Sequence, residues 1–120
     1  MNDSPLLIKS KQFALKIINV CDTLYKQQKE FVLSNQLLRS GTSIGANIRE
    51  AFYAQSKADF ISKLSISLKE CAESEYWLEL LKESNRYLDS QLLNDCIELK
   101  KLLLRRLDKC TKYICIADST

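Results

Sequence analysis

Apolar residues recur every three or four positions along four stretches of the chain, and short polar segments separate these stretches. Because this spacing places side chains on one face of an α-helix, each stretch is predicted to be an amphipathic helix. The predicted helices span residues 5–28, 34–54, 57–85 and 89–116. Four long helices with short connections predict an all-α fold, an up-down-up-down four-helix bundle that takes residues 1–120 as one domain.

The second stretch is the hardest to assign because it contains both glycines of the chain, Gly41 and Gly45. Each glycine disfavours a helix by about 1 kcal/mol relative to Ala. Leu37, Ile44 and Ile48 nevertheless keep the helical spacing, and Gly41 falls in the same series. We therefore predict a helix, since tertiary packing often overrides propensity over so short a stretch. Gly41 and Gly45 then lie one turn apart on one face, which allows a neighbouring helix to approach closely.

Small polar residues mark the predicted helix starts. Ser4 precedes the proline at position 5, which is a favourable first helical residue because it lacks an N–H group. Ser34 is predicted to cap the second helix, and Ser56, with Asp59 three residues later, is predicted to cap the third. These caps set the predicted starts of the first three helices.

A polar stripe runs along the flank of the glycine face of the second helix. It consists of Arg39, Ser43, Asn47 and Glu50, which follow one another at helical spacing. Buried polar groups need hydrogen-bond partners, so a stripe of this kind can link neighbouring helices.

The third and fourth helices carry more large apolar side chains than one bundle core uses. Ile97, Leu102 and Leu104 fall outside the main stripe of the last helix, and Trp77 widens the stripe of the third. A helix that is apolar on more than one side needs a second partner. We therefore expect a homo-oligomer that associates through helices three and four. The alternative is a set of scattered surface side chains, which are common.

Composition limits the chemistry that the chain can perform. It has no histidine, the residue most often used as a general base and metal ligand. Its five cysteines form no CxxC pair and lie on or near apolar stripes, so we expect reduced, inert thiols. A metal site would require the helices to bring Cys21, Cys71, Cys96 and Cys110 into one layer. We expect no metal, no cofactor and no enzymatic activity.

The apolar runs are too short for a membrane protein. None approaches the roughly 18 residues of a membrane-spanning helix. Near the first residue, Lys9 and Lys11 interrupt the apolar stretch, so no secretory signal is expected. Together with the reduced cysteines, these features predict a cytoplasmic protein.

Positive charge is concentrated in the fourth helix. Between Lys100 and Lys112, six basic residues and one acidic residue give a local charge of +5, in a chain whose net charge is +3. A basic stripe on a rigid helix can follow the phosphates of a nucleic acid, although an ordinary solvated face with Glu98 and Asp108 nearby remains the alternative. Helical spacing places most of these basic residues on one side, and a neighbouring first helix would extend the patch. The candidate nucleic-acid contacts are Lys101, Arg105, Arg106, Lys109 and Lys112, extended by Lys9 and Lys16.

Two segments resemble a known protein family. Residues 38–51 read LRSGTSIGANIREA, which resembles the signature of the bacterial four-helix-bundle family, also called the 23S ribosomal RNA intervening-sequence proteins. Residues 59–78, with KE at 69–70 and YWL at 76–78, resemble the third helix of one subgroup. Many members carry Gly-Ser at 69–70 and Gly at position 51, and these departures indicate a subgroup.

The resemblance has implications for assembly and function. It implies a homopentamer of bundles, encoded by genes within inserted segments of ribosomal RNA genes. It also implies kinship with proteins that assist the reverse transcriptase of diversity-generating retroelements while binding nucleic acid. The matching signature residues are expected to be structural rather than catalytic; they are Arg39, Gly41, Ser43, Gly45, Asn47 and Glu50.

The sequence therefore predicts a cytoplasmic, non-enzymatic, oligomeric helical bundle. Its expected function is non-specific binding of RNA or DNA through basic helix surfaces. The alternative is a protein–protein adaptor or scaffold that uses its extra apolar face, for example as an accessory factor for a polymerase or reverse transcriptase.

Overall fold

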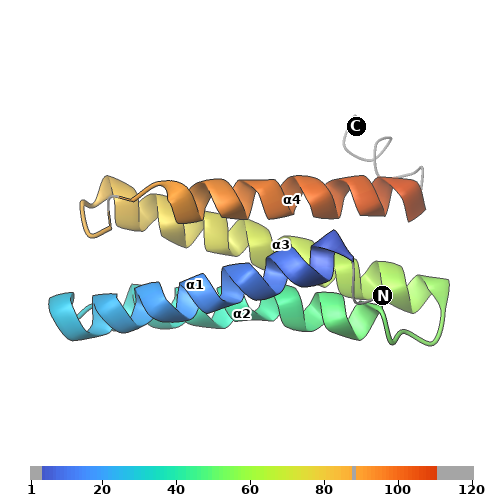
Figure 1. Cartoon of the computed structure of the whole chain (residues 1–120), viewed down its shortest axis with the longest axis horizontal. Coiled ribbons are helices and arrows are strands. Elements are labelled where there is room, and N and C mark those ends of the chain that lie inside the picture. Colours follow the sequence, from blue (N-terminus) through green and yellow to red (C-terminus); the bar gives the residue numbers. More distant parts are fainter. Residues whose placement is uncertain (1–3, 88, 111–120) are drawn as a thin grey trace.

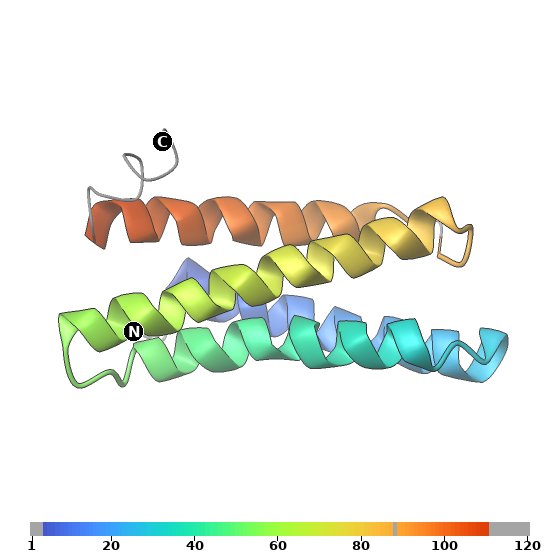
Figure 2. The same cartoon turned by 180° about the vertical axis from the view of Figure 1, so that it is seen from behind.

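The computed structural model describes residues 4–87 and 89–110, and these residues form four α-helices and no strand. Each helix contacts the next one along the chain, and α4 also contacts α1, so the four helices surround a shared core. Figures 1 and 2 show that successive helices run in opposite directions. The prediction of an all-helical chain with four helices is confirmed. The helices are α1 (Pro5–Gln28), α2 (Val32–Ala51), α3 (Lys57–Glu83) and α4 (Gln91–Cys110).

Both glycines lie within α2 and face α1, as the spacing predicted. A Cβ atom on Gly41 would lie only 2.9 Å from Cγ1 of Ile17, and one on Gly45 would lie 3.2 Å from Oγ of Ser10. Ile17 and Ser10 are both buried. The glycines are therefore needed for the close approach of α1 and α2, and the packing overrides their low helix propensity.

The start of α2 differs from the prediction. The helix begins at Val32, and Ser34 lies inside it, where its hydroxyl donates to the carbonyl of Glu30. The first turn is capped instead by the Glu30 carboxylate, which accepts a hydrogen bond of 3.0 Å from the Leu33 N–H. The assignment of Ser34 as the cap was wrong, because a longer carboxylate side chain four residues earlier satisfies the free N–H group.

Other helix ends also shift by a few residues. α2 ends at Ala51 rather than at residue 54, because the N–H groups of Tyr53 and Ala54 form turn bonds to carbonyls three residues back. α3 ends at Glu83 rather than at residue 85, since Asn85 adopts a left-handed conformation with φ of 62°. α4 begins at Gln91, whose N–H donates to the Asp89 carboxylate. Residues 111–116 of the predicted fourth helix lie outside the described residues.

The other two predicted caps have different outcomes. Ser4 occupies the cap position of α1 but its side chain makes no capping hydrogen bond, so only its position was predicted correctly. At α3, the Asp59 N–H donates to Ser56 Oγ at 3.0 Å and the Gln55 N–H donates to the Asp59 carboxylate at 3.4 Å. This reciprocal pair resembles a capping box. It differs in that Asp59 accepts from the N–H of Gln55, one residue before the cap, rather than from the N–H of Ser56 itself.

Small buried polar residues join α2 to α3. Ser74 Oγ donates to Ser40 Oγ at 2.8 Å, and Ser67 Oγ donates to the Ile44 carbonyl at 2.9 Å. All three serines are buried, and these bonds satisfy hydroxyls that would otherwise destabilise the core. Their small size also allows α2 and α3 to pack closely.

Most of the surplus apolar surface lies on other helices than the sequence predicted, although two exposed side chains, Ile66 and Tyr76, lie on α3. Trp77, Ile97, Leu102 and Leu104 are all half-buried within a single copy of the chain. Ten large apolar side chains are exposed among the described residues, and eight of them belong to α1, α2 or the residues next to α2. These eight are Ile8, Leu15, Ile18, Tyr25, Phe31, Val32, Leu38 and Tyr53. None of the helices in the described part of the chain has both the length and the apolar character to span a bilayer.

Candidate nucleic-acid interface

The exposed basic surface of α4 consists of Lys101, Arg105 and Lys109. These residues follow each other at one-turn intervals, so their backbone positions rise by about 6 Å per step. All three side chains are exposed, and none takes part in an ion pair within residues 4–87 and 89–110. Asp108 is the one acidic residue between Lys101 and Lys109, so this stretch of α4 keeps an excess of positive charge.

A shallow hollow adjoins this basic surface, where the start of α1 meets the end of α4 (Figure 1). It has a volume of about 270 Å³ and is lined by apolar side chains of Leu6 and Leu102 and by Arg105 and Lys109. Its lining therefore combines apolar and cationic side chains.

Arg106 belongs to the same basic cluster but has a structural role. Its guanidinium lies 5.5 Å from the ring centroid of Phe52 and 5.2 Å from that of Phe60, and the side chain is half-buried. The two rings pack edge to face with centroids 5.7 Å apart. This cation–π contact links α4 to Phe52, in the turn after α2, and to Phe60 in α3. The Arg106 guanidinium is therefore less free to contact a phosphate than the side chains of Arg105 and Lys109.

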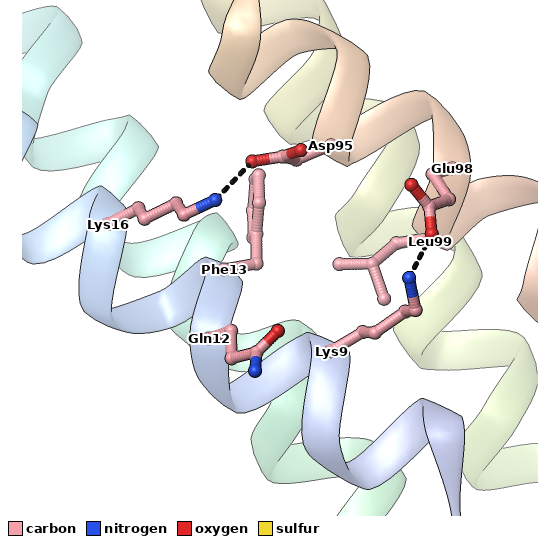
Figure 3. Close-up of a pocket in the computed structure, with 7 residues that line it drawn as sticks. All are labelled: Lys9, Gln12, Phe13, Lys16, Asp95, Glu98 and Leu99. Carbon is pink, nitrogen blue, oxygen red and sulfur yellow. Dashed lines mark hydrogen bonds and ion pairs between the residues drawn. The ribbon is translucent and has the colours of Figure 1, made fainter.

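Lys9 and Lys16 lie beside α4, as the sequence analysis required, but both are paired with acidic residues. Figure 3 shows Lys9 pointing at Glu98 and Lys16 pointing at Asp95, with the second ion pair measuring 2.8 Å. The side chains surround a small cavity of about 50 Å³ between α1 and α4. Because each positive charge is compensated, these lysines do not extend the exposed basic surface of α4.

One more basic residue of the predicted cluster, Lys100, is not part of the exposed surface. Lys100 is half-buried and donates to the Glu75 carboxylate at 2.6 Å, and this hydrogen bond raises the pKa of Lys100. Lys112 lies outside the described residues. Sequence reasoning missed Glu75 and Asp95 as partners, and it named Glu98 only as an acidic residue near the basic stripe. Asp95 and Glu98 are three residues apart whereas Lys9 and Lys16 are seven apart, so no shared spacing in the sequence predicted these pairs.

Arg39 links α2 to α3 through two carboxylates. Its guanidinium pairs with Glu70 at 3.1 Å and also with Glu73, which accepts a 2.9 Å hydrogen bond from the Trp77 indole. The Trp77 hydrogen bond and then Arg39 lower the pKa of Glu73. The hydrogen bond to Glu73 likewise raises the pKa of Arg39. The Arg39 side chain is thus part of the scaffold, as its position in the polar stripe suggested.

The remaining residues of the polar stripe are divided in their contacts. Glu50 forms an ion pair of 3.3 Å with Lys63 of α3 and so links two helices. Ser43 and Asn47 instead bond back to carbonyls four residues earlier in α2, at 2.7 Å and 2.9 Å. Among the described residues, the contacts of the two ends of the stripe, Arg39 and Glu50, join helices, whereas those of Ser43 and Asn47 stay within α2.

Three of the described cysteines, Cys21, Cys71 and Cys96, are buried in the core. Cys71 and Cys96 lie together in the core with their sulfur atoms 3.8 Å apart, and each thiol donates to the carbonyl of the other at 3.3 Å. The hydrogen bond with Cys71, together with burial, raises the pKa of Cys96. Burial raises the pKa of Cys21 to about 11. Thiols with raised pKa are poor nucleophiles at neutral pH. No group of three or more metal-ligating side chains occurs in the described ranges.

Comparisons with known proteins cover most of the chain. Residues 3–107 match the model of the 23S rRNA-intervening sequence protein family. The structure is similar to a crystal structure from Bacteroides thetaiotaomicron VPI-5482, described as a protein with unknown function from the S23 ribosomal protein family. The two chains share 53% sequence identity with a TM-score of 0.83, over 85% of this chain and 97% of the other.

No curated protein matches this chain. The family match nevertheless extends over all four helices, and its range includes the glycine-containing segment of α2 and the basic residues Lys101 and Arg105. Residues 38–51 already resemble the signature of this family. The chain belongs to the 23S rRNA-intervening sequence protein family.

Proposed function

We propose that this protein is a non-enzymatic, cytoplasmic, up-down-up-down helical bundle that self-associates and binds RNA or DNA without sequence specificity. The family resemblance supports a homopentamer as the assembly. The observation that carries the proposal is the exposed basic surface of α4, where Lys101, Arg105 and Lys109 lie at one-turn intervals without an ion-pair partner among the described residues. Cations arranged in this way attract the phosphates of either nucleic acid and do not read base edges.

The contrast with the paired lysines supports this choice of surface. A lysine that is already paired with a carboxylate neutralises little of the charge of a phosphate. Few of the cations condensed on the nucleic acid are then released. An unpaired cation gains the full attraction. One copy offers only a few such contacts, so we expect weak binding by a single copy and much stronger binding by an oligomer that presents several basic surfaces to one strand.

Titration of a labelled single-stranded RNA, followed by fluorescence anisotropy at several salt concentrations, tests the proposal. For single strands, the logarithm of the affinity should fall with the logarithm of salt concentration by about 0.7 per phosphate contacted. The double variant Arg105→Glu with Lys109→Glu removes two of the cations and should weaken binding at least about tenfold at low salt.

A matched control separates local from overall charge. Lys29→Glu with Lys82→Glu makes the same change in net charge, and both residues are exposed at the opposite end of the bundle. This control should keep most of the binding. Equal losses in the two variants, or an affinity that salt does not change, would contradict the proposed surface.

A second candidate function is a protein–protein scaffold, and the eight exposed apolar side chains around α1 and α2 favour it. Apolar exposure of this extent is typical of surfaces that bind other proteins. The two functions differ in their sensitivity to charge. Reversal at Arg105 and Lys109 should abolish nucleic-acid binding but leave a scaffold function largely intact.

A further inference from the structure

The exposed apolar side chains of α1 and α2 border a groove that follows the seam between the two helices. Leu15 is 55% exposed, Ile18 is 47% exposed and Tyr53, just after α2, is 74% exposed. From Ile8 to Tyr25, the apolar positions of α1 extend over about 25 Å of helix. An apolar strip of this length on a water-facing surface indicates a binding partner.

Three hollows lie one after another along this seam. The largest, of about 530 Å³, is lined by Ile8, Leu15 and Tyr53 among others. The next, of about 360 Å³, has small residues such as Ala14 and Gly45 in its lining. The last, of about 230 Å³, adjoins Ile18, Tyr25 and Leu38. Alanine and glycine in the lining of the middle hollow leave room there for bulky side chains from a partner.

The remaining exposed large apolar side chains lie on α3. Ile66 is 39% exposed and Tyr76 is 54% exposed, and the Tyr76 ring packs against Trp77 with centroids 5.2 Å apart. Ile66, Tyr76 and the half-buried Leu80 share the outer side of α3, since they fall at helical spacing away from the buried positions. We name this surface the α3 ridge. It is a single projecting helix face, whereas the groove is a depression between two helices.

Charges on the two surfaces are complementary. Lys11 and Arg49 line the groove, are exposed, and form no ion pair with any described residue. On α3, Glu79 and Glu83 lie close in sequence to Tyr76 and likewise form no ion pair in residues 4–87 and 89–110. Every other acidic residue of α3 either pairs with a cation or forms the capping box. Lys69, exposed and three residues after Ile66, also has no ion pair among the described residues, so the unpaired charges on and beside the ridge are one positive and two negative. Contact between the two surfaces would therefore bring net charges of opposite sign together.

We propose that the α1–α2 groove of one copy receives the α3 ridge of the next copy. This inference rests on the self-association in the proposed function and assigns its interface. α3 contacts α2 and α4 and lies across the core from α1, so groove and ridge are different surfaces of the molecule (Figure 2). A contact between two different surfaces is head-to-tail, and repetition of such a contact closes into a ring when the rotation allows it.

The proposed contact leaves the basic surface of α4 uncovered. Lys101, Arg105 and Lys109 belong to neither the groove nor the ridge. Each copy in the ring would therefore present its own cations to a shared strand. The interface and the nucleic-acid surface can then be tested independently, because substitutions in one do not touch the other.

Two variants, one for each surface, test the interface. The groove variant is Leu15→Glu with Ile18→Glu, and the ridge variant is Ile66→Glu with Tyr76→Glu. All four side chains are exposed in one copy, so circular dichroism should show an unchanged helical fold. Light scattering after gel filtration should show an oligomer for the unchanged protein and a monomer of 13.8 kDa for each variant. Arg105→Glu with Lys109→Glu is the matched control and should keep the size of the unchanged protein.

Mixing the two variants gives the sharpest test. The groove variant still has its ridge and the ridge variant still has its groove, so one productive contact remains and a heterodimer of about twice the monomer mass should form. A mixture that stays monomeric would overturn the head-to-tail contact, since an interface between identical surfaces predicts no rescue. If glutamate lowers the helix signal, serine at the same positions is the milder replacement and must give the same sizes.

Failure of the interface is distinguishable from failure of the proposed function. Variants that keep the size of the unchanged protein would overturn the groove and ridge assignment and leave self-association standing. An unchanged protein that is monomeric throughout would overturn both self-association and this interface.

Discussion

Two lysine-bearing surfaces of the molecule have the same kind of side chain and opposite electrostatic character. In the seam between α1 and α4, Lys9 and Lys16 point at Glu98 and Asp95, and their charges are compensated (Figure 3). On the outer face of α4, Lys101, Arg105 and Lys109 have no ion-pair partners among the described residues. Helical spacing of cations is therefore not sufficient to identify a surface that binds phosphates. The facing helix determines whether the positive charge is available.

The largest expected effect comes from breaking the seam that holds α1 in place. Gly41→Val puts a Cβ within 2.9 Å of Ile17, which is fully buried and cannot move aside. Overpacking of this kind costs about 1–3 kcal/mol, so the midpoint of urea unfolding should fall clearly. Ala46→Val is the matched control, because Ala46 is exposed on the same helix and should tolerate the change. An unchanged unfolding midpoint for Gly41→Val would contradict the close approach of α1 and α2.

A direct comparison of the two surfaces gives the next largest effect. Lys9→Ala with Lys16→Ala should leave RNA affinity within about twofold, because these charges are already compensated. Arg105→Ala with Lys109→Ala should reduce it by about tenfold at low salt. The two pairs remove equal charge, so anisotropy titrations of both variants side by side measure the difference that pairing makes. Equal losses would show that overall charge, rather than the exposed surface of α4, determines binding.

Removal of the acidic partners should convert the paired surface into an unpaired one. Asp95→Asn with Glu98→Gln releases Lys9 and Lys16 without changing side-chain size. RNA affinity should rise several-fold at low salt, and the salt dependence should steepen by about 0.7 for each lysine that reaches a phosphate. Exposed ion pairs contribute only about 0–1 kcal/mol, so urea unfolding should change little. A variant with unchanged salt dependence would argue against compensation as the reason for the difference.

The smallest expected effect concerns pH and the scaffold link at Arg39. Because the pKa of Glu73 is lowered in the folded protein, its contribution to stability is present above its ordinary pKa of 4.5 and is lost as pH falls through the lowered value. Acidification below about pH 4.5 should therefore lower the urea midpoint, and Glu73→Gln should reduce that dependence. Glu79→Gln is the control, since Glu79 forms no ion pair in the described residues. An identical pH profile for both variants would contradict the link.

The glycine-containing segment shows how far periodicity carries a prediction. The helical series of Leu37, Gly41 and Ile44 identified α2 even though propensity argued against it, and the spacing of the glycines indicated a close neighbour. The start of the helix was placed two residues too late, because the capping group is the side chain of Glu30 rather than that of Ser34. Glu30 lies one residue before the N-cap position, Phe31, whereas the usual capping pattern places the capping side chain at the N-cap itself.

The location of the exposed apolar surface was predicted only in part: α3 carries two of the exposed side chains, but most lie around α1 and α2. Helix patterns showed that the chain has more large apolar residues than one core can hold. They indicated Trp77 and Leu102, which are half-buried in a single copy, and missed Leu15 and Tyr53, which are exposed. Apolar residues that flank the buried face of a helix are either covered or exposed. Which of the two applies depends on how that helix is rotated about its axis relative to its neighbours. That rotation depends on which residues are small, and the glycines and serines of α2 determine it here.

By itself, the sequence determined that the chain is all-helical, that α2 is a helix with a close neighbour, and that positive charge gathers on α4. These features depend on local spacing, which is written directly in the order of residues. Only the tertiary structure decided which cations are compensated and which apolar faces are left uncovered. Both outcomes depend on contacts between residues far apart in the chain, such as Lys9 with Glu98, and such contacts form only when four helices pack at a particular rotation.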